Sequence, residues 1–413
     1  MPKAFFNPLL PRNLPLVGIL TAYAASVIGT MIAGVALPWF VLELTNDAAA
    51  AGTVAFVNTI PLIIGTLFGG VYVDRVGRRQ ASILSDAISS LSVAAIPLIH
   101  GFLGIQFWQL LLLTFIGSLL DSSSITARES LLPEVARLAR VPLPRLNAIT
   151  ETIQGLSFLI GPAIAGFLIA VIGSVNTLWV TAALSMSAVV VSLLFLPARL
   201  GRAIANSSEN YLESLKVGLR FIAKDRMIKM LIILFTVLTL AMSPLLSVIL
   251  PVFVQQKYDN AMNLGLLISA YGIGSILGVV TYGAIGHRAS QRWLLVVSIL
   301  ALSFIFGVFA FAPPFHLVLA ASAIGGILGS PFNPIVNTVL QQRTPAELRG
   351  RILGTVNGIS LIAAPMGILI AGLLLEGFGV QVALGAIALL ITLIAIWVVF
   401  NPIFRTLDKS SLR

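Results

Sequence analysis

The feature that most constrains this sequence is a series of apolar runs, each long enough to cross a lipid bilayer. About 20 helical residues span a hydrocarbon core that is about 30 Å thick. Within that core the backbone must satisfy its own hydrogen bonds, which a helix does. Twelve such runs occur, at approximately residues 14–42, 51–73, 80–100, 104–126, 147–171, 174–197, 228–253, 263–285, 292–312, 315–340, 351–375 and 378–402. We therefore expect an all-α membrane protein with twelve transmembrane helices.

Composition agrees with this expectation and excludes other classes of protein. The chain of 413 residues is 58% hydrophobic and 10% charged, with a mean hydropathy of +1.03. It contains no Cys, so disulfides and thiolate chemistry are excluded. His100, His287 and His316 are too scattered for a metal site, and no Ser/His/Asp array or phosphate-binding loop occurs. We expect neither an enzyme nor a metal or cofactor.

The basic residues are placed asymmetrically with respect to the expected spans. The formal net charge is +10. If the N-terminus lies inside, 24 of the 25 Lys and Arg fall on one side, and only Lys257 falls on the other. This is the positive-inside pattern, which predicts cytoplasmic termini in a cell inner (plasma) membrane. We expect contact with anionic membrane lipid and no binding of nucleic acid.

The first and second halves of the chain share a pattern of residues. Shifting the sequence by 213 positions places residues 37–47 on residues 250–260, and the register continues without a gap to residue 79. Pro38 and Pro251, Gly52 and Gly265, and Arg79 and Arg292 are among the ten matching pairs. Six spans separate equivalent positions, so the halves have the same orientation. The first run is too long for a signal peptide, and we expect it to be the first helix of the protein.

The repeat predicts two six-helix lobes joined by a polar segment. We expect the lobes at residues 1–197 and 227–413, with a linker at 198–226. The linker has leucines spaced along one helical face, which predicts an amphipathic helix on the cytoplasmic surface. A solvated spacer and a regulatory element are both compatible with this pattern.

The stretch GGVYVDRVGRRQ, residues 69–80, concentrates charge between the second and third spans. Positive-inside placement explains Arg75, Arg78 and Arg79. It does not explain Asp74, an acid that can pair with arginine and with the positive end of a neighbouring helix. Gly77 gives the turn conformational freedom.

This stretch resembles the signature loop of the major facilitator superfamily. The spacing of the fixed residues is Gly70-x-x-x-Asp74-Arg75-x-Gly77-Arg78-Arg79, and a degenerate second copy occurs at residues 283–293. The resemblance implies the major facilitator fold and a role of the loop in gating. It further implies an acidic partner on the fourth helix, for which Asp121 is the candidate.

Two further resemblances concern the type of transporter. Residues 157–166 partly match the antiporter motif of the fifth helix, through Gly161, Pro162 and Gly166. The match favours export, although an ordinary kinked and closely packed helix would also use such residues. Residues 128–148 and 342–358 resemble the branch that contains macrolide-type efflux pumps and the enterobactin exporter.

Polar residues recur at helical spacing within three of the expected spans. They either line a substrate path or hold helices together. The candidates are Ser26, Thr30, Thr236, Thr239, Ser243, Asn333 and Asn337. No Lys or Arg falls inside an expected span, and no acid lies at an expected midplane. We therefore expect small hydrophobic or amphiphilic substrates rather than strongly charged ones.

Three carboxylates fall within or at the ends of expected spans, namely Asp86, Asp121 and Glu151. A charged residue at the centre of a bilayer costs about 2.5–3.5 kcal/mol, so such residues are functional candidates. Proton coupling would require one of them to change protonation during transport, and Glu151 is our first choice. A wetted or ion-paired carboxylate without a coupling role is the alternative.

Together these features predict a monomeric secondary transporter that exports drug-type or macrolide-type molecules by alternating access. We expect proton antiport to drive it. The alternatives are a dedicated exporter of a siderophore-like metabolite or lipid, an importer, or a membrane receptor that does not transport.

Overall fold

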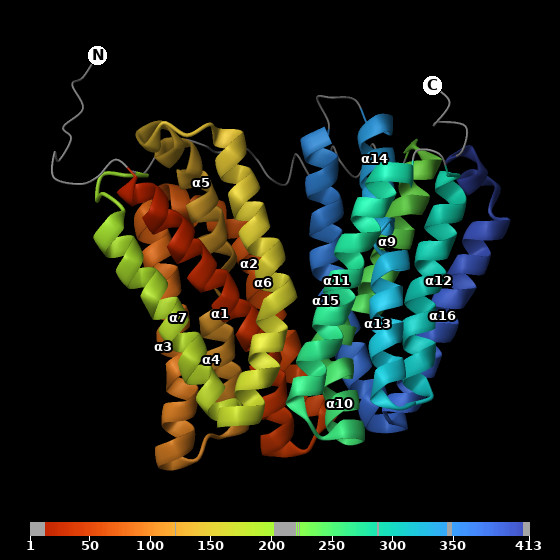
Figure 1. Ribbon diagram of the computed structural model, residues 1–413, viewed down its shortest axis with the longest axis horizontal. Coiled ribbons are helices and arrows are strands. Elements are labelled where there is room, and N and C mark those ends of the chain that lie inside the picture. The colour runs from red at the N-terminus through yellow and green to blue at the C-terminus, as the bar shows by residue number, and fades with distance from the viewer. Residues whose placement is uncertain are drawn as a thin grey trace. The chain divides into compact units, whose positions relative to one another are not determined.

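The computed structural model describes residues 13–119, 121–201, 224–286, 289–344 and 349–407, together with 220 and 222. These residues form helices and short connections (Figure 1). The first part of the chain contains α1 (Leu14–Thr45), α2 (Ala48–Val76), α3 (Arg78–Leu103), α4 (Phe107–Leu119), α5 (Asp121–Ala139), α6 (Leu143–Ile172) and α7 (Ser174–Phe195).

The second part of the chain contains both regular and interrupted helices. They are α9 (Arg226–Pro244), the π-helix η1 (Leu245–Ile249), α10 (Leu250–Tyr258), α11 (Ala261–Ile285), α12 (Gln291–Ala310), α13 (Phe315–Gly329), α14 (Phe332–Arg343), α15 (Arg349–Phe378), α16 (Val380–Phe400) and the 3-10 helix η4 (Pro402–Thr406). Capping residues mark several helix starts. Asp225 accepts hydrogen bonds from the backbone N–H groups of Met227 and Ile228, and Asn260 accepts one from Met262.

The described residues contain eleven helical segments that are long and apolar enough to cross a membrane. Some of these segments combine elements, such as Phe107–Ala139 and Arg226–Tyr258. The helix α15 contributes a shorter apolar part, Ile362–Phe378. The expected all-helical membrane protein is therefore confirmed, whereas the number twelve and the two-lobe arrangement stay predictions.

The chain divides into two compact units, and the division does not follow the midpoint of the sequence. Unit 1 comprises residues 1–33, 60–161 and 175–207, and unit 2 comprises residues 34–59, 162–174 and 208–413. As a result, α1, α2 and α6 each contribute to both units.

Within unit 1, α3 packs against α4 and α5. A buried apolar cluster joins α1 to the ends of α5 and α7. Its members are Ile19, Leu131, Leu132, Val135, Ala136, Leu146, Leu196 and Leu200. This cluster fixes the position of α5, whose preceding turns carry the polar side chains described below.

Within unit 2, α11 packs against α13, α12 against α16, and α9 against α15. The segments of α2 and α6 that belong to this unit meet the others through glycine. A Cβ atom on Gly52 would lie 3.0 Å from the Cα of Gly372 on α15. A Cβ atom on Gly265 of α11 would lie 2.4 Å from the carbonyl oxygen of Pro162 on α6. These crossings require glycine because no side chain fits between the two backbones.

Similar contacts occur in both halves, with donor residues at the spacing of the internal repeat. The Arg79 side chain donates to the carbonyl oxygen of Leu196 near the end of α7, at 2.8 Å. Arg292, 213 residues later, donates to the carbonyl oxygen of Val399 near the end of α16. In each half an arginine thus occupies the end of the last helix, where carbonyl groups lack helical partners.

A pair of serines repeats in the same way. Ser90 on α3 donates to the carbonyl oxygen of Ala182 on α7, and Ser303 on α12 donates to that of Ala388 on α16, both at 2.8 Å. Ser90 and Ser303 are also 213 residues apart. The repeat in the sequence therefore corresponds to a repeat in helix contacts.

Two expectations concern the end of the fourth span and the linker between the halves. The fourth span was expected to end near residue 126, but the helix continues as α5 to Ala139. Arg128, expected in a loop, therefore lies inside a helix, whereas the statement that no basic residue falls inside a span stays a prediction. Residues 202–219 of the expected linker, with its amphipathic helix, lie outside the described residues.

Candidate functional site

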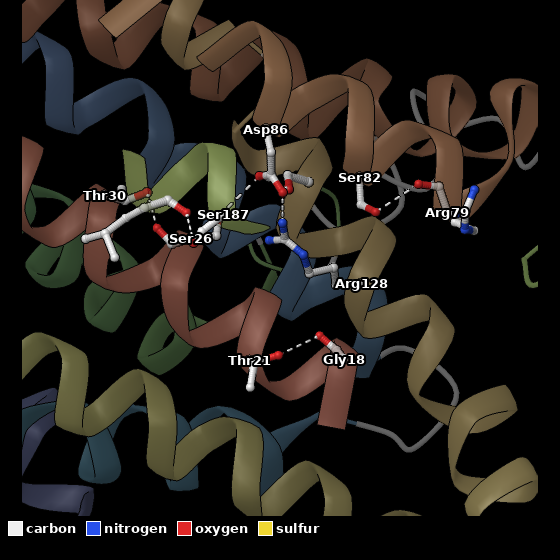
Figure 2. Close-up of polar contacts among 11 residues, drawn as sticks. Gly18, Thr21, Ser26, Thr30, Arg79, Ser82, Asp86, Arg128 and Ser187 are labelled. Carbon is white, nitrogen blue, oxygen red and sulfur yellow. Dashed lines mark hydrogen bonds and ion pairs between the residues drawn. The ribbon is translucent and has the colours of Figure 1, made fainter. Parts of the chain in front are cut away.

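A buried ion pair joins two helices of unit 1. Asp86 on α3 and Arg128 on α5 are 2% and 1% exposed, and their side chains form a salt bridge. Ser124 donates to the same carboxylate at 2.9 Å, and Ser26 of α1 donates at 3.3 Å. Figure 2 shows Arg128 directed at the Asp86 carboxylate. Three helices therefore meet at one carboxylate.

The guanidinium group of Arg128 is only partly satisfied. Its Nη2 atom binds Asp86, whereas Nε and Nη1 are buried without a hydrogen-bond partner among the described residues. The hydroxyl groups of Ser85 and Ser123 are in the same situation. Buried donors are normally paired, and an unpaired one costs about 1–3 kcal/mol. This arrangement therefore has unused capacity to bind a polar group.

Further titratable groups lie close to the pair. Tyr23 on α1, which is 2% exposed, interacts electrostatically with Arg128, Glu129 and Glu151. Glu129 and Glu151 also interact with each other. Glu151, on α6, and Glu129, on α5, are both exposed. The buried pair is thus adjacent to two carboxylates that solvent can reach.

Asp121 lies at the start of α5, in the first turn of that helix. The positive end of the helix dipole favours a carboxylate there. Its side chain hydrogen-bonds with Ser89 of α3. The helix α5 continues from Asp121 for 19 residues to Ala139, within the helical segment Phe107–Ala139.

The signature-loop residues contact backbone carbonyl groups in unit 1. Arg79 donates to Leu196 and Leu193 of α7, and Arg78 donates to Ser130 of α5. Gly77 has a φ of 94°, a conformation that favours glycine. The structure does not bring Asp121 to these arginines: the ion pairs among the described residues are Asp86 with Arg128 and Asp225 with Arg343.

The remaining residues of the signature loop are Arg75, Asp74 and Gly70. Arg75 is exposed at the end of α2. The side chain of Asp74 and the environment of Gly70 lie outside the described residues. The gating roles of all these residues stay predictions.

A cavity of about 450 Å³ lies within unit 2. Its lining comes from α9, η1, α10, α11, α12, α13 and α14, and among the described residues no charged side chain contributes to it. Aromatic rings of Phe235, Tyr271 and Phe332 lie beside the hydroxyl groups of Thr239 and Ser243. Cavities of about 300–1,000 Å³ with mostly apolar walls and a few polar groups are typical of small-molecule sites.

Two helix interruptions border this cavity. Leu245 and Leu246 of the π-helix η1 line it. Gly329 and Ser330, at the break between α13 and α14, line it as well. Single π-helical turns are frequent at functional sites, and discontinuous membrane helices form binding sites in many transporters.

The candidate substrate-path residues have different positions. Thr239, Ser243 and Asn333 line the cavity. The Thr239 hydroxyl donates to the carbonyl oxygen of Phe235 on its own helix, and the Ser243 hydroxyl donates to that of Ala364 on α15 at 2.9 Å. Asn333 is exposed and offers its amide group.

The other candidates lie elsewhere. Thr236 donates to Ile232 of its own helix, and Asn337 is exposed. Ser26 supports Asp86, and Thr30 donates to the carbonyl oxygen of Ser26 (Figure 2). The structure therefore brings only part of the predicted path together.

The motif on α6 consists of two close helix contacts. A Cβ atom on Gly161 would lie 2.6 Å from the Cβ of Met31 in unit 1. A Cβ atom on Gly166 would lie 2.6 Å from the carbonyl oxygen of Ala261 in unit 2. The carbonyl oxygen of Pro162 is the atom that Gly265 of α11 closely approaches, as described above. The small residues of this motif are thus explained by packing.

Membrane-length helices, an uncharged drug-sized cavity between interrupted helices and one buried ion pair define a polytopic membrane protein of the transporter class. The model of a family described as "Transmembrane secretion effector" matches residues 6–413. The chain belongs to this family, within the major facilitator superfamily. These are transporter families, which supports the interpretation that the chain is not an enzyme.

Three relatives illustrate the similarity in sequence. The multidrug efflux pump Tap of Mycolicibacterium fortuitum is 35% identical over 401 residues, covering 96% of this chain and 98% of Tap. The pump of the same name from Mycobacterium tuberculosis is 31% identical, covering 95% and 94%. The enterobactin exporter EntS of Escherichia coli is 27% identical and covers 89% of each chain.

Solved structures share the fold at low sequence identity. The nucleoside transporter NupG gives a TM-score of 0.75 at 15% identity, covering 94% of this chain and 100% of NupG. A bacterial homologue of the iron transporter ferroportin, in an inward-facing state, gives 0.69 at 16% identity, covering 94% and 99%. At this identity the likeness concerns the fold alone.

The sequence analysis missed Arg128, Glu129 and the aromatic lining of the cavity. Arg128 lies seven residues after Asp121 and so on a similar helical face. That spacing was a usable signal for a longer helix. The aromatic residues gave no signal, because Phe and Tyr inside apolar runs are as compatible with packing as with a site.

Proposed function

We propose that this protein exports small, uncharged, largely hydrophobic molecules of the drug type. The cavity in unit 2 carries this proposal, because its walls are apolar and aromatic and its polar groups are neutral. A charged substrate would lose hydration there without gaining an ionic partner. The names of the Tap relatives, which are multidrug efflux pumps, support the same substrate class.

Transport proceeds by alternating access between two six-helix lobes. We place twelve spans in the plasma membrane with both termini in the cytoplasm, since 24 of the 25 Lys and Arg then lie inside. The glycine crossings of α2 with α15 and of α6 with α11 support this mechanism. Contacts without interlocking side chains separate and re-form at little cost in repacking.

The signature loop contributes to gating in this proposal. Arg78 and Arg79 connect the start of α3 to α5 and α7 in unit 1, so displacement of the loop would disturb two other helices. Gly70, Asp74, Arg75, Gly77 and Asp121 complete the proposed gate. The same mechanism requires neither a cofactor nor oligomerisation.

Protons drive export by antiport. Asp86, Asp121 and Glu151 are the coupling candidates, and they lie on α3, α5 and α6 within unit 1. Asp86 has the buried position and the ionic partner that a coupling group requires.

Accumulation of labelled macrolides and neutral lipophilic dyes in efflux-deficient cells tests this function. Cells that express the protein should accumulate less of at least one compound than cells that do not. An uncoupler that collapses the proton gradient should abolish the difference. Equal accumulation across the whole panel would contradict drug export, and a difference that survives the uncoupler would contradict proton coupling.

A dedicated exporter of a siderophore-like metabolite is the second candidate. The relationship to the enterobactin exporter EntS favours it. The cavity offers Asn333 and hydroxyl groups as hydrogen-bond partners for a polar metabolite. Export of enterobactin without any effect on neutral dyes would favour this candidate over drug export.

A further inference from the structure

The structural repeat provides an internal comparison for the buried ion pair. Arg79 and Ser90 flank Asp86 on α3, and both make contacts that Arg292 and Ser303 repeat on α12. Each pair is separated by 213 residues. Both helices are continuous between the flanking positions. The equivalent of Asp86 is therefore fixed as residue 299.

That residue is Ile299, whose side chain is fully buried. Asp86 and Arg128 are the only charged side chains in the buried class among those the structure describes. Burying two charges incurs a desolvation cost that a well-packed apolar side chain does not, and apolar replacements of such pairs are often neutral or stabilising. In the second half, isoleucine fills the position equivalent to Asp86. Packing therefore does not require a charged residue there, and the charges in the first half have a role other than packing.

We propose that Asp86 binds the proton that is exchanged for substrate, and that Arg128 is a positioning residue that changes its partner when the proton arrives. This inference rests on the proposed proton antiport. It assigns the coupling site to a buried pair on α3 and α5 rather than to Glu151 on α6.

The proposed step involves one new O–H bond. A proton added to the Asp86 carboxylate removes the negative charge that holds the guanidinium group of Arg128. Arg128 keeps its own proton and stays cationic. Its Nε and Nη1 donors, which have no partner among the described residues, then turn toward Glu129 and Glu151.

The surroundings of the pair fit this exchange. Tyr23 of α1 interacts electrostatically with Arg128 and with both Glu129 and Glu151. Glu129 and Glu151 repel each other, and a cation between them would relieve that repulsion. Among the described residues, Asp121 is a further carboxylate of α5, and it hydrogen-bonds with Ser89 of α3.

The exchange has a structural consequence. In the ionised state, α5 is bonded to α3 through the ion pair, and Ser26 bonds α1 to the same carboxylate. In the protonated state, the cation would bond α5 to α6 through Glu151. Proton binding therefore changes which helix α5 is bonded to, and this change links the proton to the movement of the helices.

Proton release on ligand binding tests the inference directly. Purified protein in detergent, in weakly buffered solution with a pH indicator, is mixed with the neutral dye Nile red. Binding is measured in parallel by quenching of tryptophan fluorescence. The wild type should release protons on binding, whereas Asp86→Asn should bind the dye within about threefold of wild-type affinity and release at least tenfold fewer protons.

Two further variants separate coupling from packing. Arg128→Lys retains the positive charge and should retain release, with a shift in the pH at which release is half-maximal. Asp86→Ile combined with Arg128→Met replaces both charges with apolar side chains, with isoleucine as at position 299, and should bind dye without release. Glu376→Gln, which removes an exposed carboxylate of α15, is the matched control and should behave as the wild type.

The outcomes distinguish this inference from the function on which it rests. If the wild type binds dye and releases no proton, proton antiport itself is wrong. If Asp86→Asn or the apolar double variant releases protons as the wild type does, antiport stands and the assignment to Asp86 is overturned. An unchanged pH profile in Arg128→Lys would show that Arg128 has only a packing role.

Discussion

The Asp86 carboxylate receives donors from three side chains on two neighbouring helices, and this explains why two charges are tolerated inside unit 1. Arg128 supplies the charge, while Ser26 and Ser124 supply hydroxyl groups. Removing one partner of a buried pair is far more costly than replacing both, because an unpaired charge is left in an apolar surrounding.

Arg128→Ala should therefore lower the free energy of unfolding by about 3–5 kcal/mol. Denaturant-induced unfolding of the purified protein in detergent measures this loss. The apolar double variant Asp86→Ile with Arg128→Met should recover most of it. A single variant as stable as the wild type would contradict the burial of the pair.

A second prediction concerns the cavity. Ser275 on α11 lines it, whereas its neighbour Ile276 is exposed on the outer surface of the same helix. Ser275→Phe should fill part of the cavity and weaken Nile red binding about tenfold or more, which corresponds to about 1.4 kcal/mol. Ile276→Phe adds a ring outside the cavity and should leave the affinity unchanged. Equal effects of the two variants would place the binding site elsewhere.

At the scale of elements, helix ends and helix crossings organise the molecule. Arg79 binds carbonyl groups at the end of α7, and Arg292 binds the corresponding end of α16. The crossing of α6 with α11 depends on Gly166 and Gly265, whose missing side chains allow backbone contact. The arginine contacts recur in both halves, and the glycine crossing pairs two helices. Neither can be read from the helix boundaries alone.

Loss of the Arg79 side chain should loosen the end of α7. Hydrogen bonds from charged groups contribute about 1.5–3 kcal/mol, so Arg79→Ala should speed amide hydrogen exchange around residues 192–196 by about tenfold or more. Arg75→Ala, at an exposed position, serves as control and should not change exchange there. Unaltered exchange in Arg79→Ala would mean that this cap is dispensable.

A methyl group at the α6 crossing should separate the two helices. Gly166→Ala places a Cβ atom 2.6 Å from the carbonyl oxygen of Ala261, whereas Gly155→Ala, on the same helix, meets nothing within 4 Å. The chain has no Cys, so a cysteine introduced at Ala163 reports on the crossing. Maleimide should label it faster in the Gly166→Ala background and at an unchanged rate in the Gly155→Ala background. Equal labelling in both would contradict close packing of α6 on α11.

Most helices could be predicted from the sequence because apolar runs and loop charges define membrane spans. The prediction failed where a helix continues through polar residues, as α5 does from Asp121 past Arg128. Length and hydropathy mark the end of the apolar run rather than the end of the helix, and they do not register that Asp86 neutralises the arginine. The pairing of these residues depends on the packing of α3 on α5, which no local pattern encodes.

The candidate site was predicted less completely than the fold. Thr239, Ser243 and Asn333 do line one cavity, because polar residues at helical spacing share a face. Ser26 was expected on the substrate path but bonds Asp86 instead. The sequence shows which face carries polar groups and leaves open whether that face meets a cavity or another helix.

At the scale of the whole molecule, the functional interpretation depends on the internal repeat and on the differences between its two copies. Both halves preserve the contacts of Arg79 and Ser90 through Arg292 and Ser303. Among the residues that the structure describes, the buried ion pair lies in unit 1 and the drug-sized cavity lies in unit 2. In the proposed mechanism, the duplicated scaffold carries the proton-binding group in one unit and the binding cavity in the other.

Dye efflux driven by an imposed proton gradient tests this account most directly. Efflux-deficient cells that express the protein are de-energised, loaded with Nile red and then exposed to acidified medium. The account predicts a burst of efflux from cells with the wild-type protein and none from cells with Asp86→Asn at equal membrane abundance. If acidification produces no more efflux from wild-type cells than from cells without the protein, proton-driven export is contradicted.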